Sequence, residues 1–337
     1  MLELSVLWWT VTIVLIVGLL AFDLIFAAAR PHAVGFKEAV GWSVFYILIA
    51  VAFGLAFMWY AGADFGAQYF AGYIVEKSLS VDNLFVFVII MTTFAVPEAH
   101  QHKVLTFGII IALILRAIFI VVGAALLDLF AVMFLLFGLL LIFTAIQLFR
   151  HRDQDPDVQE NGLVKLTRKV IPVTTEYDGG RLFTRIDGKK LATPLFIVLI
   201  AIGSTDLLFA LDSIPAVFGV TAEPYIVFVA NAFALLGLRA LFFLVKGLLD
   251  RLVYLSTGLA IILAFIGVKL VLHWAHGIWP GVPTVSTNAS LVVIVVVLAV
   301  TTVASLIKTK NDPSAKAHPG SLRANPHSDE HSSPRPS

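Results

Sequence analysis

Four carboxylates stand in two apolar stretches that share one pattern. Glu76 and Asp82 are six residues apart in the first stretch. Asp206 and Asp212 have the same spacing in the second. A carboxylate at the centre of a membrane helix costs about 2.5 to 3.5 kcal/mol on insertion scales, and such residues commonly mark ion pathways or proton relays. Carboxylates are hard oxygen donors that favour Mg²⁺, Ca²⁺ or Mn²⁺, so the pattern predicts a divalent-cation site.

Neighbouring polar residues extend the expected site. On a helix, Glu76 aligns with Ser80 and Asn83, and Asp206 aligns with Ser213, at spacings of four or seven residues. The chain has no cysteine, which excludes thiolate sites for zinc or copper. The residues that we expect to bind the metal ion are Glu76, Asp82, Asn83, Asp206, Asp212, Ser213 and the further intramembrane acid Asp23.

The six-residue spacing leaves two geometries open. Positions six apart on an unbroken helix differ by about 240°, so the two acids of one stretch would not share a face. Either each helix presents two polar faces, or each is distorted so that its acids converge. Gly203 and Pro215 offer points of distortion in the second stretch, where free carbonyls could coordinate a cation.

Two alternative interpretations of the acids do not involve transport. The acids could form structural ion pairs with Lys77, Arg116 and Arg239, which would lower the cost of burial; both arginines could also pair with Asp128 or Asp250. Two aspartates on two helices could also form an intramembrane protease. No Gly-x-Gly-Asp accompanies either aspartate. We therefore expect no catalytic residues, no enzymatic activity and no prosthetic group.

The composition is that of a membrane protein. The 337 residues are 59% hydrophobic and 13% charged, with a mean hydropathy of +0.95, whereas soluble domains are about 25% charged. A net charge of +1 argues against a nucleic-acid partner. Apolar runs of about 20 residues match the hydrocarbon thickness of a bilayer and predict an all-α, polytopic protein. We expect about nine transmembrane helices, at residues 5–28, 38–60, 70–95, 104–123, 126–149, 194–219, 225–246, 252–273 and 288–307.

Lysine and arginine gather in alternate loops between these segments. The loops near residues 61–68, 123–125, 221–224 and 275–287 contain neither residue. Because basic loops stay in the cytoplasm, we expect an outside N-terminus and a cytoplasmic C-terminus. The expected location is a bacterial-type inner (plasma) membrane, with the lipid bilayer as a partner.

A longer internal repeat contains the two acidic stretches. Leu115-Arg116-Ala117 follows the first stretch, and Leu238-Arg239-Ala240 follows the second. The copies are three helices apart, so their directions across the membrane are opposite. Such inverted repeats are common in secondary transporters. The predicted parts are 1–69 (two helices), 70–149 and 194–273 (the two repeats), 150–193 (a cytoplasmic loop), 274–310 (the last helix) and 311–337 (a disordered tail).

The cytoplasmic loop contains two turn signals, Asp178-Gly179-Gly180 and Asp187-Gly188, spaced for a small hairpin around Arg181–Ile186. A connector lying on the inner membrane surface is one interpretation of this loop. A docking site for soluble stress proteins is another.

The strings EKSLSVDNLFVF (76–87) and STDLLFALDSIPAV (204–217) resemble the hallmark stretches of the TerC family of integral membrane proteins. The run from Phe22 to Tyr46 is also similar to that family's N-terminal pattern. The resemblance implies membership of the LysE-like transporter superfamily and export of metal ions, chiefly Mn²⁺, with an association with tellurite resistance. It assigns cation coordination or proton exchange to Glu76, Asp82, Asp206 and Asp212, and also to Asp23.

Two other functions remain open from the sequence. A Ca²⁺/H⁺-type exchanger would use the same carboxylates, and only ion competition would distinguish it from a manganese exporter. A membrane scaffold for a stress-response complex would instead depend on residues 150–193. In that case, neutral substitutions of the intramembrane acids would leave function intact.

Overall fold

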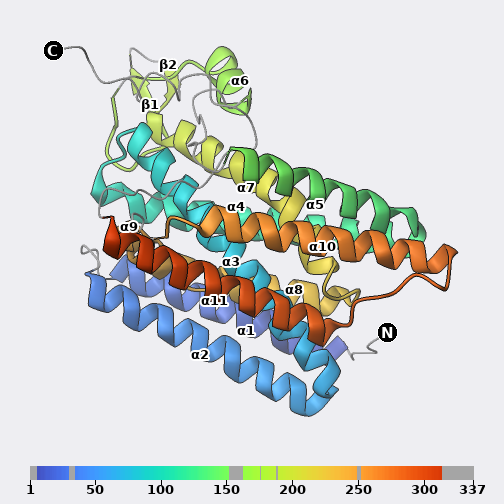
Figure 1. The fold of residues 1–337 in the computed structure, drawn as a ribbon. Helices are drawn as coiled ribbons and strands as arrows, with labels where there is room; N and C mark the ends of the chain where they lie inside the picture. The colour runs from blue at the N-terminus through green and yellow to red at the C-terminus, as the bar shows by residue number, and fades with distance from the viewer. Residues whose placement is uncertain are drawn as a thin grey trace.

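The structure is a computed structural model, and it describes residues 6–29, 35–151, 162–174, 176–186, 189–248 and 252–312. Most of the long helices run side by side as a bundle, while α6, β1 and β2 gather at one end of it (Figure 1). The elements are α1 (Val6–Ala29), α2 (Phe36–Ala61), α3 (Ala63–Thr93), α4 (Glu98–Leu129), α5 (Val132–Arg150), α6 (Gly162–Val170), β1 (Phe183–Ile186), β2 (Lys189–Ala192), α7 (Pro194–Phe218), α8 (Pro224–Leu235), α9 (Leu238–Leu248), α10 (Leu255–Ile278) and α11 (Thr287–Asn311).

Several described helices have the length and hydropathy of membrane spans. Seven pass on their own: α1, α2, α4, α5, α7, α10 and α11. The pair α8 and α9 passes only as one span bent by 46°, which raises the number to eight. The 31-residue helix α3 is not among them, and it carries Glu76, Lys77 and Asp82. The described part of the chain is therefore mostly helical, with seven or eight candidate spans, which agrees with the predicted polytopic membrane protein; the two short strands β1 and β2 are the departure from an all-α fold.

Several predicted helix boundaries are wrong, among them the start of α3 and the end of α4. Helix α3 begins at Ala63 rather than near residue 70, directly after Gly62, whose positive φ of 103° turns the chain out of α2. Helix α4 continues to Leu129, although we expected the turn near Gly123–Asp128. The alanines and leucines after Gly123 favour helix, and the turn comes at Phe130, where the backbone is extended.

The predicted segment 225–246 is two helices. Helix α8 ends at Leu235, and α9 begins at Leu238. Gly237 between them has a φ of +73°, a conformation that favours glycine. A Cβ atom added at Gly237 would lie 2.5 Å from the ring of Tyr46, so the break is also closely packed. Uniform apolar composition concealed this break in the sequence.

Helix α7, in contrast, is continuous through Gly203 and Pro215, the two points at which the sequence allowed a distortion. It runs from Pro194 to Phe218 and includes Pro215. A proline removes one backbone hydrogen bond, and here it lies in the last turn of the helix, where little helix remains to be disrupted. Since α3 is also continuous, both acidic stretches fit the geometry with two polar faces.

Close backbone contacts hold the bundle together. Helices α5 and α10 pack along each other (Figure 1), and a Cβ atom at Gly138 would lie 2.7 Å from the carbonyl oxygen of Gly267. Helix α3 contacts α2, α7, α8, α9 and α11, so it has a central position. Glu76 of α3 is therefore surrounded by protein.

The predicted hairpin in the 150–193 loop is confirmed. Strands β1 and β2 are antiparallel, with Phe183 opposite Ala192. The contacts that join this region to the helices include two hydrogen bonds: Lys103 Nζ donates to the Gly180 carbonyl at 2.5 Å, and the Tyr177 hydroxyl donates to the Phe94 carbonyl at 2.7 Å. The predicted disordered tail lies outside the described residues from position 313 onward.

Candidate cation site

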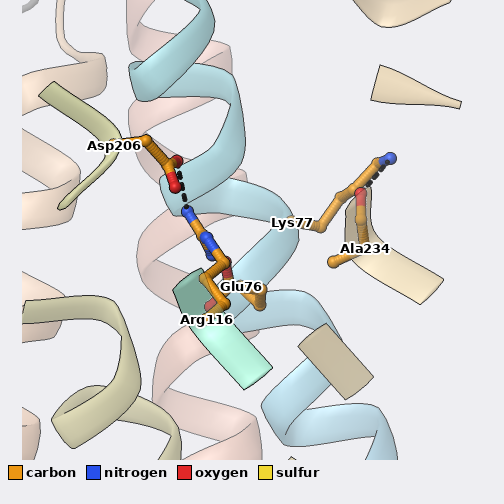
Figure 2. Close-up of polar contacts among 5 residues, drawn as sticks. All are labelled: Glu76, Lys77, Arg116, Asp206 and Ala234. Carbon is orange, nitrogen blue, oxygen red and sulfur yellow. Dashed lines mark hydrogen bonds and ion pairs between the residues drawn. The ribbon is translucent and has the colours of Figure 1, made fainter. Parts of the chain in front are cut away.

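Arg116 of α4 lies between the two acidic helices. Its side chain is fully buried, and its Nη1 atom forms an ion pair with Oε1 of Glu76 on α3. Its Nη2 atom is 3.2 Å from Oδ1 of Asp206 on α7 (Figure 2). Glu76 is 0% and Asp206 2% exposed. One guanidinium therefore joins the first acid of each copy of the motif.

Asn83 is a third group at the same guanidinium. With its amide oxygen turned toward the arginine, that oxygen accepts a hydrogen bond from Arg116 Nη2 at 2.9 Å, and its nitrogen donates to the Leu79 carbonyl at 3.0 Å. This orientation follows from the hydrogen-bond partners on each side. We define the Arg116 cluster as Arg116, Glu76, Asp206 and Asn83.

Helical spacing explains how these side chains meet. Glu76, Ser80 and Asn83 share one face of α3, and all three are buried, as the spacing predicted. Asp206 and Ser213 share a face of α7 in the same way, and both are 2% exposed. On each acidic helix, the polar residues spaced four or seven positions apart therefore face the interior of the protein.

Several oxygen atoms in these rows have no hydrogen-bond partner among the described residues. They are Glu76 Oε2, Asp206 Oδ2, Ser80 Oγ and Ser213 Oγ. Buried polar atoms in proteins are nearly always partnered, so unpartnered oxygens in such a cluster can serve as ligands for a cation. The cluster has two carboxylates and one guanidinium, which gives a formal charge of −1.

The second acid of the α7 stretch has a different position from the first. Asp212 is only partly buried on α7, six residues beyond Asp206. The side chain of Asp82 lies outside the part of the chain that the structure describes. Among the side chains that are described, no three acidic or histidine groups lie together as a metal cluster.

Asp23 forms a separate ion pair. Its Oδ1 atom is 3.0 Å from Nη2 of Arg239 on α9, and it accepts a hydrogen bond from the Tyr46 hydroxyl at 2.9 Å. The structure thus places the expected Asp23 ligand with Arg239 rather than with Arg116. Arg239 and Asp23 are both largely buried, with side-chain exposures of 10% and 14%.

Sequence analysis missed the role of Lys77. Its Nζ atom donates to the Ala234 carbonyl at 3.0 Å and also approaches the Leu236 carbonyl at 3.5 Å, instead of pairing with its neighbour Glu76 (Figure 2). These carbonyls are at the end of α8, which the break deprives of intrahelical donors. The only signal in the sequence was Gly237 within an apolar run.

Comparisons with known proteins agree on the class of protein. The model of the integral membrane protein TerC family matches residues 61–313. An uncharacterized membrane protein of Myxococcus xanthus is 43% identical over 309 residues, which cover 92% of this chain and 95% of that protein. The chloroplastic thylakoid membrane protein TERC of Arabidopsis thaliana is 44% identical over 263 residues, covering 78% of this chain and 67% of that protein.

A Salmonella typhi protein is 37% identical over 273 residues, covering 78% of this chain and 85% of that protein. Its assigned role, as a membrane-bound redox modulator, is itself provisional. No solved structure matches the chain. From the extent of the family match and these relatives, the chain belongs to the TerC family of integral membrane proteins.

Proposed function

We propose that this protein is a secondary transporter that moves a divalent cation, chiefly Mn²⁺, out of the cytoplasm. The observation that carries the proposal is the Arg116 cluster, in which Glu76 and Asp206 come from the two copies of the acidic motif. Acids from two matched elements meeting inside a helical bundle fit the midplane site of an alternating-access transporter. Rocking of one copy against the other would then expose the site to each side in turn.

The finer topology belongs to the same proposal. Counting α3 and the bent pair α8 and α9 with the seven apolar helices gives nine crossings. The first inverted repeat is α3 to α5, and the second is α7 to α10. The N-terminus would lie outside and the C-terminus in the cytoplasm of a bacterial-type inner membrane, as the basic loops predict.

The charge and the donor set favour a hard cation as substrate. The formal charge of the cluster is −1; its free oxygens are carboxylate oxygens, and the nearby polar rows add the hydroxyl groups of Ser80 and Ser213. An anion would be repelled, and a soft metal ion would lack its preferred ligands. The Salmonella relative is described as a redox modulator. Because this chain contains no cysteine, it could not perform such a role through thiol groups of its own. We expect neither a prosthetic group nor an enzymatic reaction.

Manganese flux in proteoliposomes tests the proposal. Purified wild type should move Mn²⁺, and Asp206→Asn should abolish the flux. Asp128→Asn is the matched control, because it makes the same substitution at an exposed position on α4. If folded wild type moves no divalent cation under a pH gradient of either direction, the proposal is wrong.

Two further measurements separate the alternatives. A Ca²⁺/H⁺ exchanger would show calcium flux that manganese inhibits only weakly. A stress-response scaffold would lose its cellular phenotype when residues 150–193 are replaced by a short linker, but would keep it in Asp206→Asn. If the protein is a transporter, Asp206→Asn should abolish the cellular phenotype, and replacement of residues 150–193 should leave it intact.

A further inference from the structure

We propose that Arg116 is a built-in cation that competes with the transported ion for Glu76 and Asp206. This inference rests on the proposed function, because it concerns how the same site releases its substrate. It gives Arg116 a role that the acidic motif alone does not contain.

The contacts of Arg116 are the first step of the argument. The described oxygen donors at the centre of the expected site are Glu76, Asp206 and Asn83, and the guanidinium engages all three. A metal ion that binds both oxygens of each carboxylate would need Glu76 Oε1 and Asp206 Oδ1, which the guanidinium engages, as well as the unpartnered Oε2 and Oδ2. Full coordination of the ion by Glu76 and Asp206 therefore requires that Arg116 loosen or leave.

Burial makes this competition strong. Arg116, Glu76 and Asp206 are all 2% exposed or less, so solvent screens their charges poorly. A divalent ion placed beside Arg116 would bring three positive charges to two carboxylates. The arginine should therefore weaken binding, and its return to the acids should help to expel the ion.

Manganese binding to purified protein in detergent tests this inference. The probe is Mn²⁺ alone, and loss of the free-ion electron paramagnetic resonance signal reports binding. Arg116→Gln should bind Mn²⁺ at least about tenfold more tightly than wild type, because a buried like charge has been removed. Its flux in proteoliposomes should fall, since release is slowed.

Two control variants separate charge from structure. Arg116→Lys keeps the positive charge and should bind Mn²⁺ with nearly wild-type affinity. Arg239→Gln makes the same substitution at the matching position of the second copy, where the partner is Asp23, and should leave the affinity unchanged. A purely structural Arg116 would instead give weaker binding in Arg116→Gln.

Loss of folding in Arg116→Gln would not prevent the test. The double variant Glu76→Gln with Arg116→Gln removes one charge of each sign, so it is compared with Glu76→Gln alone. The double variant should bind Mn²⁺ at least about tenfold more tightly than the single one. Equal or weaker binding in either comparison overturns the inference. If wild type binds Mn²⁺ but the Arg116→Gln variants bind it no more tightly, the inference about Arg116 fails and the proposed function stands. If neither wild type nor these variants bind Mn²⁺, both the inference and the proposed function fail.

Discussion

The two arginines of the repeated Leu-Arg-Ala motif have different partners. Arg116 lies on the continuous helix α4, is fully buried and joins Glu76 to Asp206. Arg239 lies on the short helix α9, is 8% exposed and pairs with Asp23 of α1, outside both copies. Arg116 thus provides the counterion for the first acid of each stretch, and Arg239 links α9 to the N-terminal helix α1.

The break between α8 and α9 accompanies this difference. In the first copy, the helix that carries the arginine is unbroken for 32 residues, whereas in the second it is interrupted before Leu238. Lys77 of the first copy donates to the carbonyls at this break, and the matching residue of the second copy is Leu207. Lys77 thus has no cationic counterpart in the second stretch, and it donates to the carbonyls at the end of the interrupted helix.

The largest effect that we predict is on stability at the two arginines. Arg116→Met leaves two carboxylates buried without a cation and should lower the free energy of unfolding by about 3 to 5 kcal/mol. Arg239→Met should cost less, since Asp23 is 14% exposed and keeps the Tyr46 hydroxyl. Equilibrium unfolding in mixed micelles, followed by tryptophan fluorescence, measures both. Equal losses would contradict the difference between the copies.

The second effect concerns the break itself. Gly237→Ala places a Cβ atom at a positive φ and against Tyr46, so it should lower the free energy of unfolding by about 2 to 3 kcal/mol. The control is Gly203→Ala within α7, where the added Cβ meets only Ile111 at 3.5 Å. That control should be neutral or slightly stabilising. The same unfolding assay applies, and a tolerated Gly237→Ala would show that the break is not constrained.

The third effect is local. Lys77→Met leaves the carbonyls of Ala234 and Leu236 without their donor and should cost about 1 to 2 kcal/mol. Hydrogen exchange of the amides around residues 234–241 should accelerate. Lys269→Met is the control: Lys269 donates to the Ser290 hydroxyl, so its loss should affect only α10 and α11. Unchanged exchange near the break in Lys77→Met would remove the proposed stabilising role of Lys77.

The smallest effect lies at the end of the bundle. Lys103→Ala removes the hydrogen bond to Gly180 at an exposed position, so global stability should change by no more than about 0.5 kcal/mol. Limited proteolysis within residues 176–186 should nevertheless become faster. A large loss of global stability would mean that the hairpin region stabilises both copies of the motif.

Particular residues show how far the sequence could predict the site. The alignment of Glu76 with Ser80 and Asn83 followed from helical periodicity, and the structure confirms that this row is buried. Helical periodicity could not predict that Arg116, rather than Arg239, pairs with Glu76 and Asp206. Both arginines stand in the same Leu-Arg-Ala motif, and only the packing of the helices, with α4 against α7, brings Arg116 to Glu76 and Asp206.

The sequence by itself determined that this chain is a helical, multi-pass membrane protein with two matched acidic stretches, because hydropathy and spacing act locally along the chain. The tertiary structure alone decided which charges meet. The ion pairs of Arg116 and Asp23 join residues 40 to 216 positions apart, and the break at Gly237 exposes carbonyls that a distant lysine must satisfy. In a medium without water, every buried charge and carbonyl needs a partner, and the packing of the helices determines where that partner lies.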